Sequence, residues 1–198
     1  MTLPLLLYLR PFTSDGKVTV ANPEKSSIWR NLMPTSSSGT EANITLEELI
    51  LQSSAGIGLL IAIGKTVEIV GAGKVIAGDS EWQEYFMALS LKAGCILSVP
   101  SMHPSTTWEI EWLARNKLFH RVVFVFTDLH FSGNDIANFD KDVIGRHLRT
   151  SGWAIPNDLT SSTLLSFTPE GSVESVVHDS RHKKGHVRAQ IQQVIARQ

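Results

Sequence analysis

The chain has 198 residues, a hydrophobic content of 42%, a charged content of 19% and a formal net charge of −1. These values are typical of one globular domain with a sizeable core, and they give no overall attraction for nucleic acid or an anionic membrane. The single cysteine, Cys95, excludes an internal disulfide and a cysteine-built zinc site. No apolar run approaches the roughly 18 residues that span a bilayer, and residues 1–10 lack signal-peptide features, so we expect a cytoplasmic protein.

The first third of the chain predicts two strands around a long irregular segment. Residues 3–9 are almost continuously apolar, as in a central parallel strand covered on both faces. Residues 17–43 are rich in Ser, Thr, Pro and Asn, which predicts a loop with one short helix near residues 27–32. Thr45, followed three residues later by Glu48, predicts the start of a helix in capping-box fashion. Residues 59–63 then predict the second strand.

From residue 74 onward, strands alternate with helices. Residues 74–77 predict a short third strand, and Asp79 or Ser80 caps a helix to about residue 92 whose apolar face is Trp82, Tyr85, Phe86, Leu89 and Ala93. Strands are predicted at 95–99, 121–127, 164–167 and 173–177. Helices are predicted from near Trp108 to 116, over 139–149 and over 185–197.

This alternation predicts an α/β fold with a mostly parallel central sheet and helices on both faces. There is no internal repeat or low-complexity linker, so we expect one domain over residues 1–198. Its core would be residues 1–150, and residues 151–198 would form a C-terminal extension that packs on that core.

Residues 95–112 are the predicted functional centre. A strand ends near Val99, Pro100 and Pro104 break the chain, and Ser105, Thr106 or Thr107 can cap the following helix. Glu109 and Glu111 would then lie in its first turn, beside the carboxyl end of a strand, where open α/β sheets bind ligands. The alternative is that these carboxylates complement the helix dipole.

Other residues near predicted strand ends suit a nucleotide. Arg10 follows the first strand and can bind a phosphate, or can form an ion pair with Asp15 or Glu109 instead. Phe12 and Trp108 can stack on a base or a nicotinamide ring, or can pack in the core.

Several other motifs are rejected. Gly64-Lys65-Thr66 lacks the glycine of a phosphate-binding loop at position 59, and Gly71-Ala72-Gly73 lacks the third glycine of a dinucleotide fingerprint at position 76. His178, His182 and His186 are four residues apart, but Gly185 interrupts them, so a solvated basic segment is preferred and no metal site is predicted. Nucleic acid is not an expected partner, because residues 181–188 are the single basic patch.

Three short motifs resemble the Toll/interleukin-1 receptor (TIR)-like domains of the bacterial type, over roughly residues 3–150. They are Leu9-Arg10-Pro11-Phe12 with Asp15, Asp79-Ser80-Glu81-Trp82-Gln83, and Thr107-Trp108-Glu109-Ile110. The resemblance implies a flavodoxin-like fold. Some members of this family are NAD glycohydrolases, and others only assemble signalling complexes. In the catalytic members a glutamate of this helix contacts the ribose next to the nicotinamide. Glu109 is the best match and Glu111 the second, although position 105 is Ser where the usual Trp-Cys pair would have Cys.

The resemblance therefore implies a nucleotide-binding protein that hydrolyses the nicotinamide–ribose bond of NAD, as an NAD nucleosidase. NAD would be the substrate and no cofactor would be required. Glu109 and Glu111 are the catalytic candidates, and the nucleotide-binding candidates are Arg10, Phe12, Asp15 and Trp108. Two alternatives remain at this point. One is a non-catalytic module that self-associates through the Trp108 helix and the 17–43 loop, and the other is a nucleotide sensor without turnover.

Overall fold

The computed structural model describes residues 3–9, 19–21, 43–64, 73–78, 80–126, 139–159, 163–178 and 184–198. Its main sheet has seven strands in the order β5-β4-β1-β6-β7-β8-β9. The first five of these in that order are parallel, whereas β8 runs antiparallel to β7 and β9 antiparallel to β8. The strands are β1 (Leu5–Leu9), β4 (Leu59–Gly64), β5 (Gly73–Ile76), β6 (Cys95–Ser98), β7 (Val122–Phe126), β8 (Thr163–Phe167) and β9 (Val173–His178).

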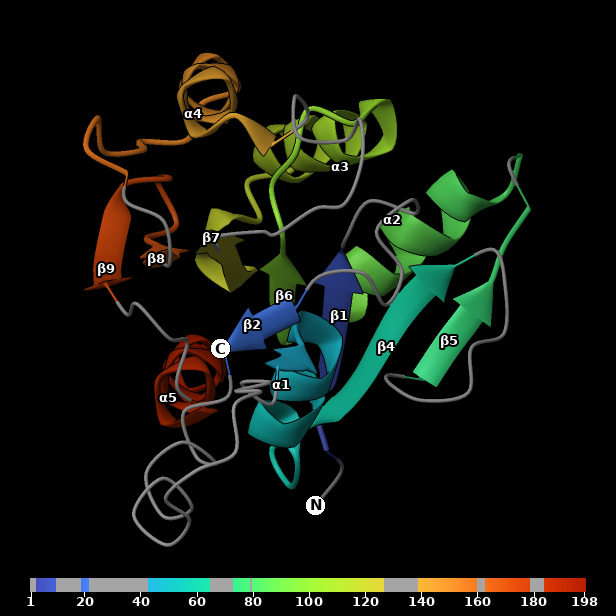
Figure 1. Ribbon diagram of the computed structural model, residues 1–198. Coiled ribbons are helices and arrows are strands. Elements are labelled where there is room, and N and C mark those ends of the chain that lie inside the picture. Colours follow the sequence, from blue (N-terminus) through green and yellow to red (C-terminus); the bar gives the residue numbers. More distant parts are fainter. Residues whose placement is uncertain are drawn as a thin grey trace, which may run out of the picture.

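Helices cover both faces of this sheet, as Figure 1 shows, so the predicted α/β class is confirmed. One face carries α2 (Trp82–Lys92), α3 (Pro104–Arg115) and α4 (Lys141–Thr150), and the other carries α1 (Leu46–Ser54) and α5 (Lys184–Ile195). The chain moves outward through β4 and β5, then crosses to β6 on the other side of β1. Right-handed crossovers in opposite directions place α1 and α3 on opposite faces.

The two faces of the sheet have different cores. The core beneath α2, α3 and α4 is rich in aromatic side chains: the rings of Phe124 and Trp153 lie 4.7 Å apart, and those of Trp153 and Phe167 lie 4.9 Å apart. The core beneath α1 and α5 is mainly aliphatic. Every residue of β7 is buried, which agrees with its continuous apolar sequence and its place inside the sheet.

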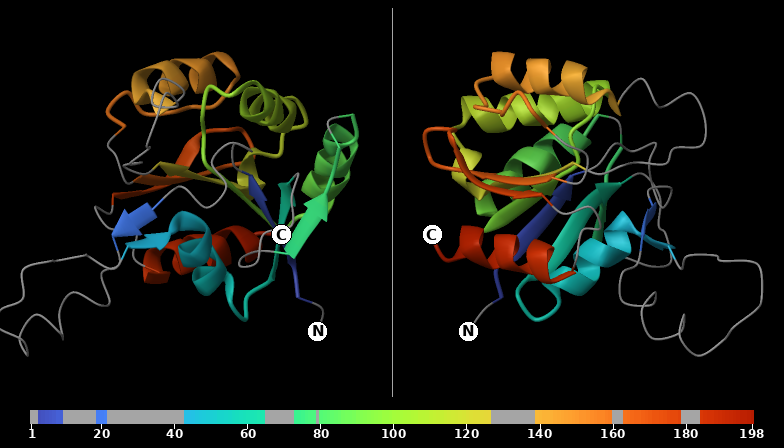
Figure 2. Two further views of the ribbon diagram at one scale, coloured as in Figure 1. Left: turned by 45° about the vertical axis from the view of Figure 1, so that its right-hand side comes forward. Right: turned by 60° about the vertical axis from the view of Figure 1, so that its left-hand side comes forward.

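Residues 151–198 were expected to form an extension that packs on the core, and in the structure this segment supplies the last two strands of the sheet, β8 and β9. All five residues of β8 are buried, and β9 forms the edge beyond it. Val187, Ile191 and Val194 of α5 are buried in the same core as α1, and Figure 2 shows these two helices on one side of the sheet. Arg188 Nη1 donates a hydrogen bond to the carbonyl of Ala55, at 2.8 Å, which ties α5 to the end of α1.

The predicted start of α1 is confirmed. Thr45 is the N-cap, and its Oγ1 accepts a hydrogen bond from the backbone N–H of Glu48 at 3.1 Å. A cap of this kind satisfies one of the amide groups that have no partner within the helix. The helix ends before Gly56, whose φ of +75° is a conformation that favours glycine.

Two predictions about loops and caps are wrong. The segment 17–43 is not entirely a loop, because β2 (Thr19–Ala21) pairs antiparallel with β3 (Asn43–Thr45). The cap of α2 is Glu81, without a side-chain hydrogen bond, rather than Ser80. The other predicted cap, Asp79, and the predicted short helix over 27–32 lie outside the described residues. Tyr85 is also exposed rather than part of the buried face of α2.

The helix predicted to begin near Trp108 begins four residues earlier, at Pro104. His103 occupies the N-cap position, and none of Ser105, Thr106 and Thr107 is the cap. Proline suits the first turn because the N–H that it lacks would have no partner within the helix. As a result, no acidic residue lies in the first turn of α3, and Glu109 is one turn further along. The dipole explanation for Glu109 and Glu111 therefore loses its basis.

Candidate functional site

The sheet has a topological switch point between β1 and β6. From β1 the chain continues to β4 on one side, and β6 follows on the other side of β1. The connections that leave these two strands separate at their carboxyl ends, and open α/β sheets bind ligands in that position. Arg10, Phe12 and Asp15 follow β1 directly in the sequence but lie outside the described residues. The described part of the predicted site comes from β6 and α3.

Helix α3 buries a face that contains polar groups. Its buried residues are Thr106, Glu109, Ile110, Leu113 and Ala114, at the spacing of one helical face. Ile110 and Leu113 belong to the aromatic-rich core. Thr106 and Glu109 occupy the half of this face nearer the start of the helix. That half lies toward the carboxyl edge of the sheet, because α3 runs antiparallel to the strands that it connects.

Glu109 is the most unusual residue of this face. It is 3% exposed, and its Oε2 atom has no hydrogen-bond partner among the residues that the structure describes. Burial raises the pKa of its carboxyl from 4.5 to about 8, because the charged form loses its hydration. At neutral pH in the free protein, Glu109 is therefore mainly a neutral carboxylic acid.

Two hydroxyl groups near the end of β6 are in the same situation. Ser98 Oγ and Thr106 Oγ1 are buried and have no hydrogen-bond partner within the described part of the chain. Ser98 alternates with Leu97, so it faces the same side of the sheet as Ile96, which packs in the core beneath α3. Buried polar groups in native proteins are almost always hydrogen-bonded. The partners of these groups therefore lie in water, in a ligand or elsewhere in the chain.

The loop from β6 to α3 is held by short-range hydrogen bonds. Ser101 Oγ accepts a hydrogen bond from the backbone N–H of His103 at 3.3 Å, and His103 Nδ1 lies 2.8 Å from Ser105 Oγ. Thr107 Oγ1 donates to the carbonyl of Pro104. These bonds fix where α3 begins, and so they fix which of its residues point toward the sheet.

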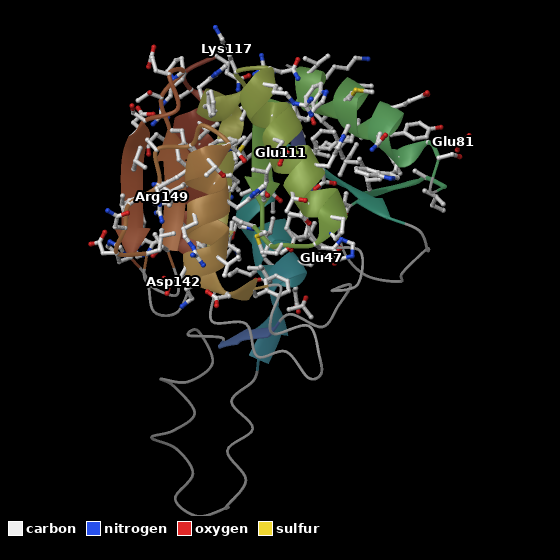
Figure 3. The ribbon with its side chains drawn as sticks, turned by 90° about the horizontal axis from the view of Figure 1, so that it is seen from above. Glu47, Glu81, Glu111, Lys117, Asp142 and Arg149 are labelled. Carbon is white, nitrogen blue, oxygen red and sulfur yellow. The ribbon has the colours of Figure 1, made fainter. Side chains whose placement is uncertain are left out.

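Glu111 lies on a different face of α3 from Glu109. Two residues turn a helix by about 200°, so these side chains point in nearly opposite directions. Glu111 is 48% exposed, and Figure 3 shows it on the outer side of the helix layer. Its Oε1 atom lies 3.8 Å from Nε2 of His147 on α4. The structure does not bring the two predicted carboxylates together.

An open groove between α3 and α4 contains Glu111. It has a volume of about 400 Å³ and is lined by Glu111, Arg115, His147, Thr150 and Ser151. This groove was not predicted from the sequence. Its residues come from two helices about 35 positions apart, and no motif in the sequence marks them.

Trp108 is half-buried between α2 and α3. Its ring makes edge-to-face contacts with Trp82, at a centroid distance of 5.2 Å, and with Phe86, at 5.6 Å. Trp82 was predicted to lie on the apolar face of its helix, which agrees with this cluster, and Phe86 also contacts Trp112 at 5.4 Å. The stacking of Trp108 on a ligand ring stays a prediction.

No protein-family model, no curated protein and no solved structure matches this chain. Among the described residues, no helix is long and apolar enough to cross a membrane. The same residues contain no group of three or more His, Cys, Asp or Glu side chains arranged to hold a metal ion.

Proposed function

We propose that this protein is a TIR-like domain that binds a nucleotide such as NAD at the β1–β6 switch point and hydrolyses its nicotinamide–ribose bond. The observation that carries the proposal is the carboxyl of Glu109, buried and without a hydrogen-bond partner for Oε2 among the described residues. Strongly perturbed carboxyl groups of this kind concentrate at functional sites. Its position one turn into the helix after β6 is the position that the TIR resemblance implies for the catalytic glutamate.

The chemistry requires one well-placed carboxylate. When the bond between the ribose carbon and the nicotinamide nitrogen breaks, its electron pair goes to nicotinamide and positive charge develops on the ribose ring. A carboxylate in a water-poor site stabilises this charge far more strongly than it would in water. Water then forms the new carbon–oxygen bond, and the products are nicotinamide, ADP-ribose and one proton. Glycoside hydrolysis uses carboxylates in a related way.

The remaining candidates have supporting roles in this proposal. Arg10 would bind a phosphate group of the nucleotide, Asp15 would be a further nucleotide-binding residue, and Phe12 and Trp108 would contact its rings. The hydroxyls of Ser98 and Thr106 would supply hydrogen bonds to the sugar next to Glu109, since each is buried without a partner in the described part of the chain.

The direct test is release of nicotinamide from NAD by the purified protein, with Glu109→Gln and Glu111→Gln measured beside it. We expect the wild type to release nicotinamide and Glu109→Gln to lose about 100-fold or more, since removal of one charge-stabilising group commonly has this effect. Glu84→Gln, an exposed change on α2, is the control for loss of a surface charge. A selective loss in Glu111→Gln would assign the reaction to the other carboxylate.

Thermal unfolding in the presence of NAD, measured beside the release assay, separates the alternatives. A protein that releases no nicotinamide but is stabilised by NAD against heat would be a nucleotide sensor. Saturation at 100 times the dissociation constant adds about 2.7 kcal/mol to the free energy of unfolding. A protein that shows neither release nor stabilisation would refute the nucleotide proposal.

A second candidate function is a non-catalytic interaction module. β5 is an edge strand with exposed Ile76, and the neighbouring α2 exposes Tyr85 and Leu91. Figure 2 shows β5 and α2 at the same end of the sheet. Edge strands with apolar side chains favour pairing with another chain. If this face self-associates, light scattering will show a mass that rises with concentration, and Ile76→Lys will abolish the rise.

A further inference from the structure

The open groove between α3 and α4 contains charged groups that do not pair with one another. It has a volume of about 400 Å³ and is lined by Glu111, Arg115, His147, Thr150 and Ser151. Arg115 is the last residue of α3 and His147 lies in the last turn of α4, so the carboxyl-terminal halves of both helices meet here. Figure 3 shows the two helices side by side. The groove is therefore at the far end of α3 from the β1–β6 switch point.

Glu111 and Arg115 have the spacing of an ion pair but point to different partners. They are four residues apart on one helix, where opposite charges usually attract each other. Arg115 Nε instead donates a hydrogen bond to the backbone carbonyl of Glu111 at 3.4 Å, and the carboxylate of Glu111 faces His147. Within the described part of the chain, the terminal nitrogens of Arg115 make no hydrogen bond or ion pair. Both side chains can therefore bind a ligand.

The contact between Glu111 and His147 is too long for a hydrogen bond. Glu111 Oε1 lies 3.8 Å from His147 Nε2, whereas an N–H···O hydrogen bond spans about 2.7–3.2 Å. This nitrogen is buried and has no hydrogen-bond partner among the described residues. A carboxylate oxygen accepts hydrogen bonds, and so does an imidazole nitrogen that carries no proton. An ammonium group about 2.9 Å from each atom would donate to both and would balance the charge of Glu111.

We propose that this groove binds a free α-amino acid with a small polar side chain, its ammonium group between Glu111 and His147 and its carboxylate on Arg115. A guanidinium group binds a carboxylate through two parallel hydrogen bonds. The negative ends of the two helix dipoles add to the attraction for the ammonium group. The hydroxyls of Thr150 and Ser151 complete the lining of the groove and can bond a polar side chain of the ligand.

Titration of the ¹⁵N-labelled full chain with L-serine, followed by two-dimensional amide NMR, tests this proposal. Two analogues each lack one charge: N-acetyl-L-serine has no ammonium group, and L-serinamide has no carboxylate. For so small a ligand we expect a dissociation constant of about 1 mM. Each analogue should bind about tenfold more weakly or worse, because it loses one charge-assisted contact. The amide signals that shift should belong to residues 111–115 and 147–151.

Arg115→Gln removes the carboxylate contact, and Arg146→Gln is its matched control. Both arginines are exposed and donate Nε to the carbonyl four residues earlier, but Arg146 does not line the groove. Arg115→Gln should bind L-serine about tenfold more weakly or worse, and L-serinamide as the wild type does. Arg146→Gln should bind both probes as the wild type does. A cooperative unfolding transition confirms that each variant is folded.

Three results would overturn the proposal. One is the absence of any shift with L-serine at about ten times the expected dissociation constant. Another is equal binding of L-serine and N-acetyl-L-serine, which would mean that the groove takes a simple carboxylate. The third is equal binding of L-serine by Arg115→Gln and Arg146→Gln. NAD takes no part in these measurements, so failure of the amino-acid site would leave the proposed nucleotide site unaffected.

Discussion

Replacement of Glu109 by glutamine should change how the stability of the protein depends on pH. In the folded protein, burial raises the pKa of this carboxyl from 4.5 to about 8. Between these values the folded state keeps a proton that the unfolded state has lost. The free energy of unfolding therefore falls as the pH rises through this range, and the contribution is lost fully only above the folded pKa. Glutamine does not titrate, so the variant lacks this decrease.

The size of the effect follows from the shift in pKa. Each pH unit within the range removes about 1.4 kcal/mol, so the wild type should lose about 4 kcal/mol relative to Glu109→Gln between about pH 5 and about pH 8. A natural domain is stable by about 5–15 kcal/mol, so this is a large fraction of the total. The amide of the glutamine also needs hydrogen bonds in the buried site. This need changes the free energy of unfolding of the variant by an amount that is the same at every pH.

Urea unfolding at several pH values measures this difference directly. The wild type and Glu109→Gln are compared at each pH, so that the other titrating groups, including the histidines, cancel. Glu84→Gln, at an exposed position, is the control for loss of a surface carboxylate. Parallel curves for the wild type and Glu109→Gln across the range would refute the argument, because they would mean that Glu109 ionises in the folded protein as it does in the unfolded chain.

Four further substitutions test the fold by urea unfolding. Trp153→Ala should cost about 3–5 kcal/mol, because this buried ring contacts three phenylalanines of the core, and near-wild-type stability would contradict that role. Gly171→Ala should destabilise the protein, because φ is +86° and a Cβ would lie 3.2 Å from the carbonyl oxygen of Gly152. Gly185→Ala in α5 should stabilise the protein by about 0.5–1 kcal/mol, because a Cβ there would meet nothing within 4 Å. The opposite order would contradict the geometry. Thr45→Ala should cost about 1 kcal/mol through loss of the α1 cap, and no change would show that the cap is dispensable.

A site built on Glu109 would explain why the protein retains an arrangement that reduces its stability near neutral pH. Three buried polar atoms without partners among the described residues, at Ser98, Thr106 and Glu109, each lose hydration on folding. Residues at functional sites are commonly less than optimal for stability. An increase in the stability of Glu109→Gln, together with loss of nicotinamide release, would show that Glu109 lowers the stability of the protein but supports its activity.

The type and order of most elements were determined by local sequence patterns. The apolar runs of β1, β6 and β7 predicted buried parallel strands, since a strand covered by helices on both faces needs apolar residues at consecutive positions. The Thr45–Glu48 pair predicted the start of α1 because a cap is a contact between residues three positions apart. Such features depend on residues that are close together in the chain, so the sequence alone predicts them.

The partners of the last two strands could not be predicted in the same way. Residues 164–167 and 173–177 were identified as strands, but their antiparallel addition to β7 depends on contacts between β7 and β8 about 40 residues apart in the sequence. The groove between α3 and α4 is likewise formed by side chains that no motif connects. The residues of β2 were missed because short paired strands without an apolar run carry little local signal.

The candidate site also has a part that the sequence predicted and a part that depends on the tertiary structure. The sequence by itself determined that two glutamates follow the β6 strand on one helix, because the strand, the break at two prolines and the helix are all local patterns. Only the tertiary structure decided between them. Packing of Ile110 and Leu113 against the sheet turned Glu109 into the interior and left Glu111 on the surface. The raised pKa of Glu109 arises from that burial, and burial depends on the helix and the sheet together rather than on the residue's neighbours in the chain.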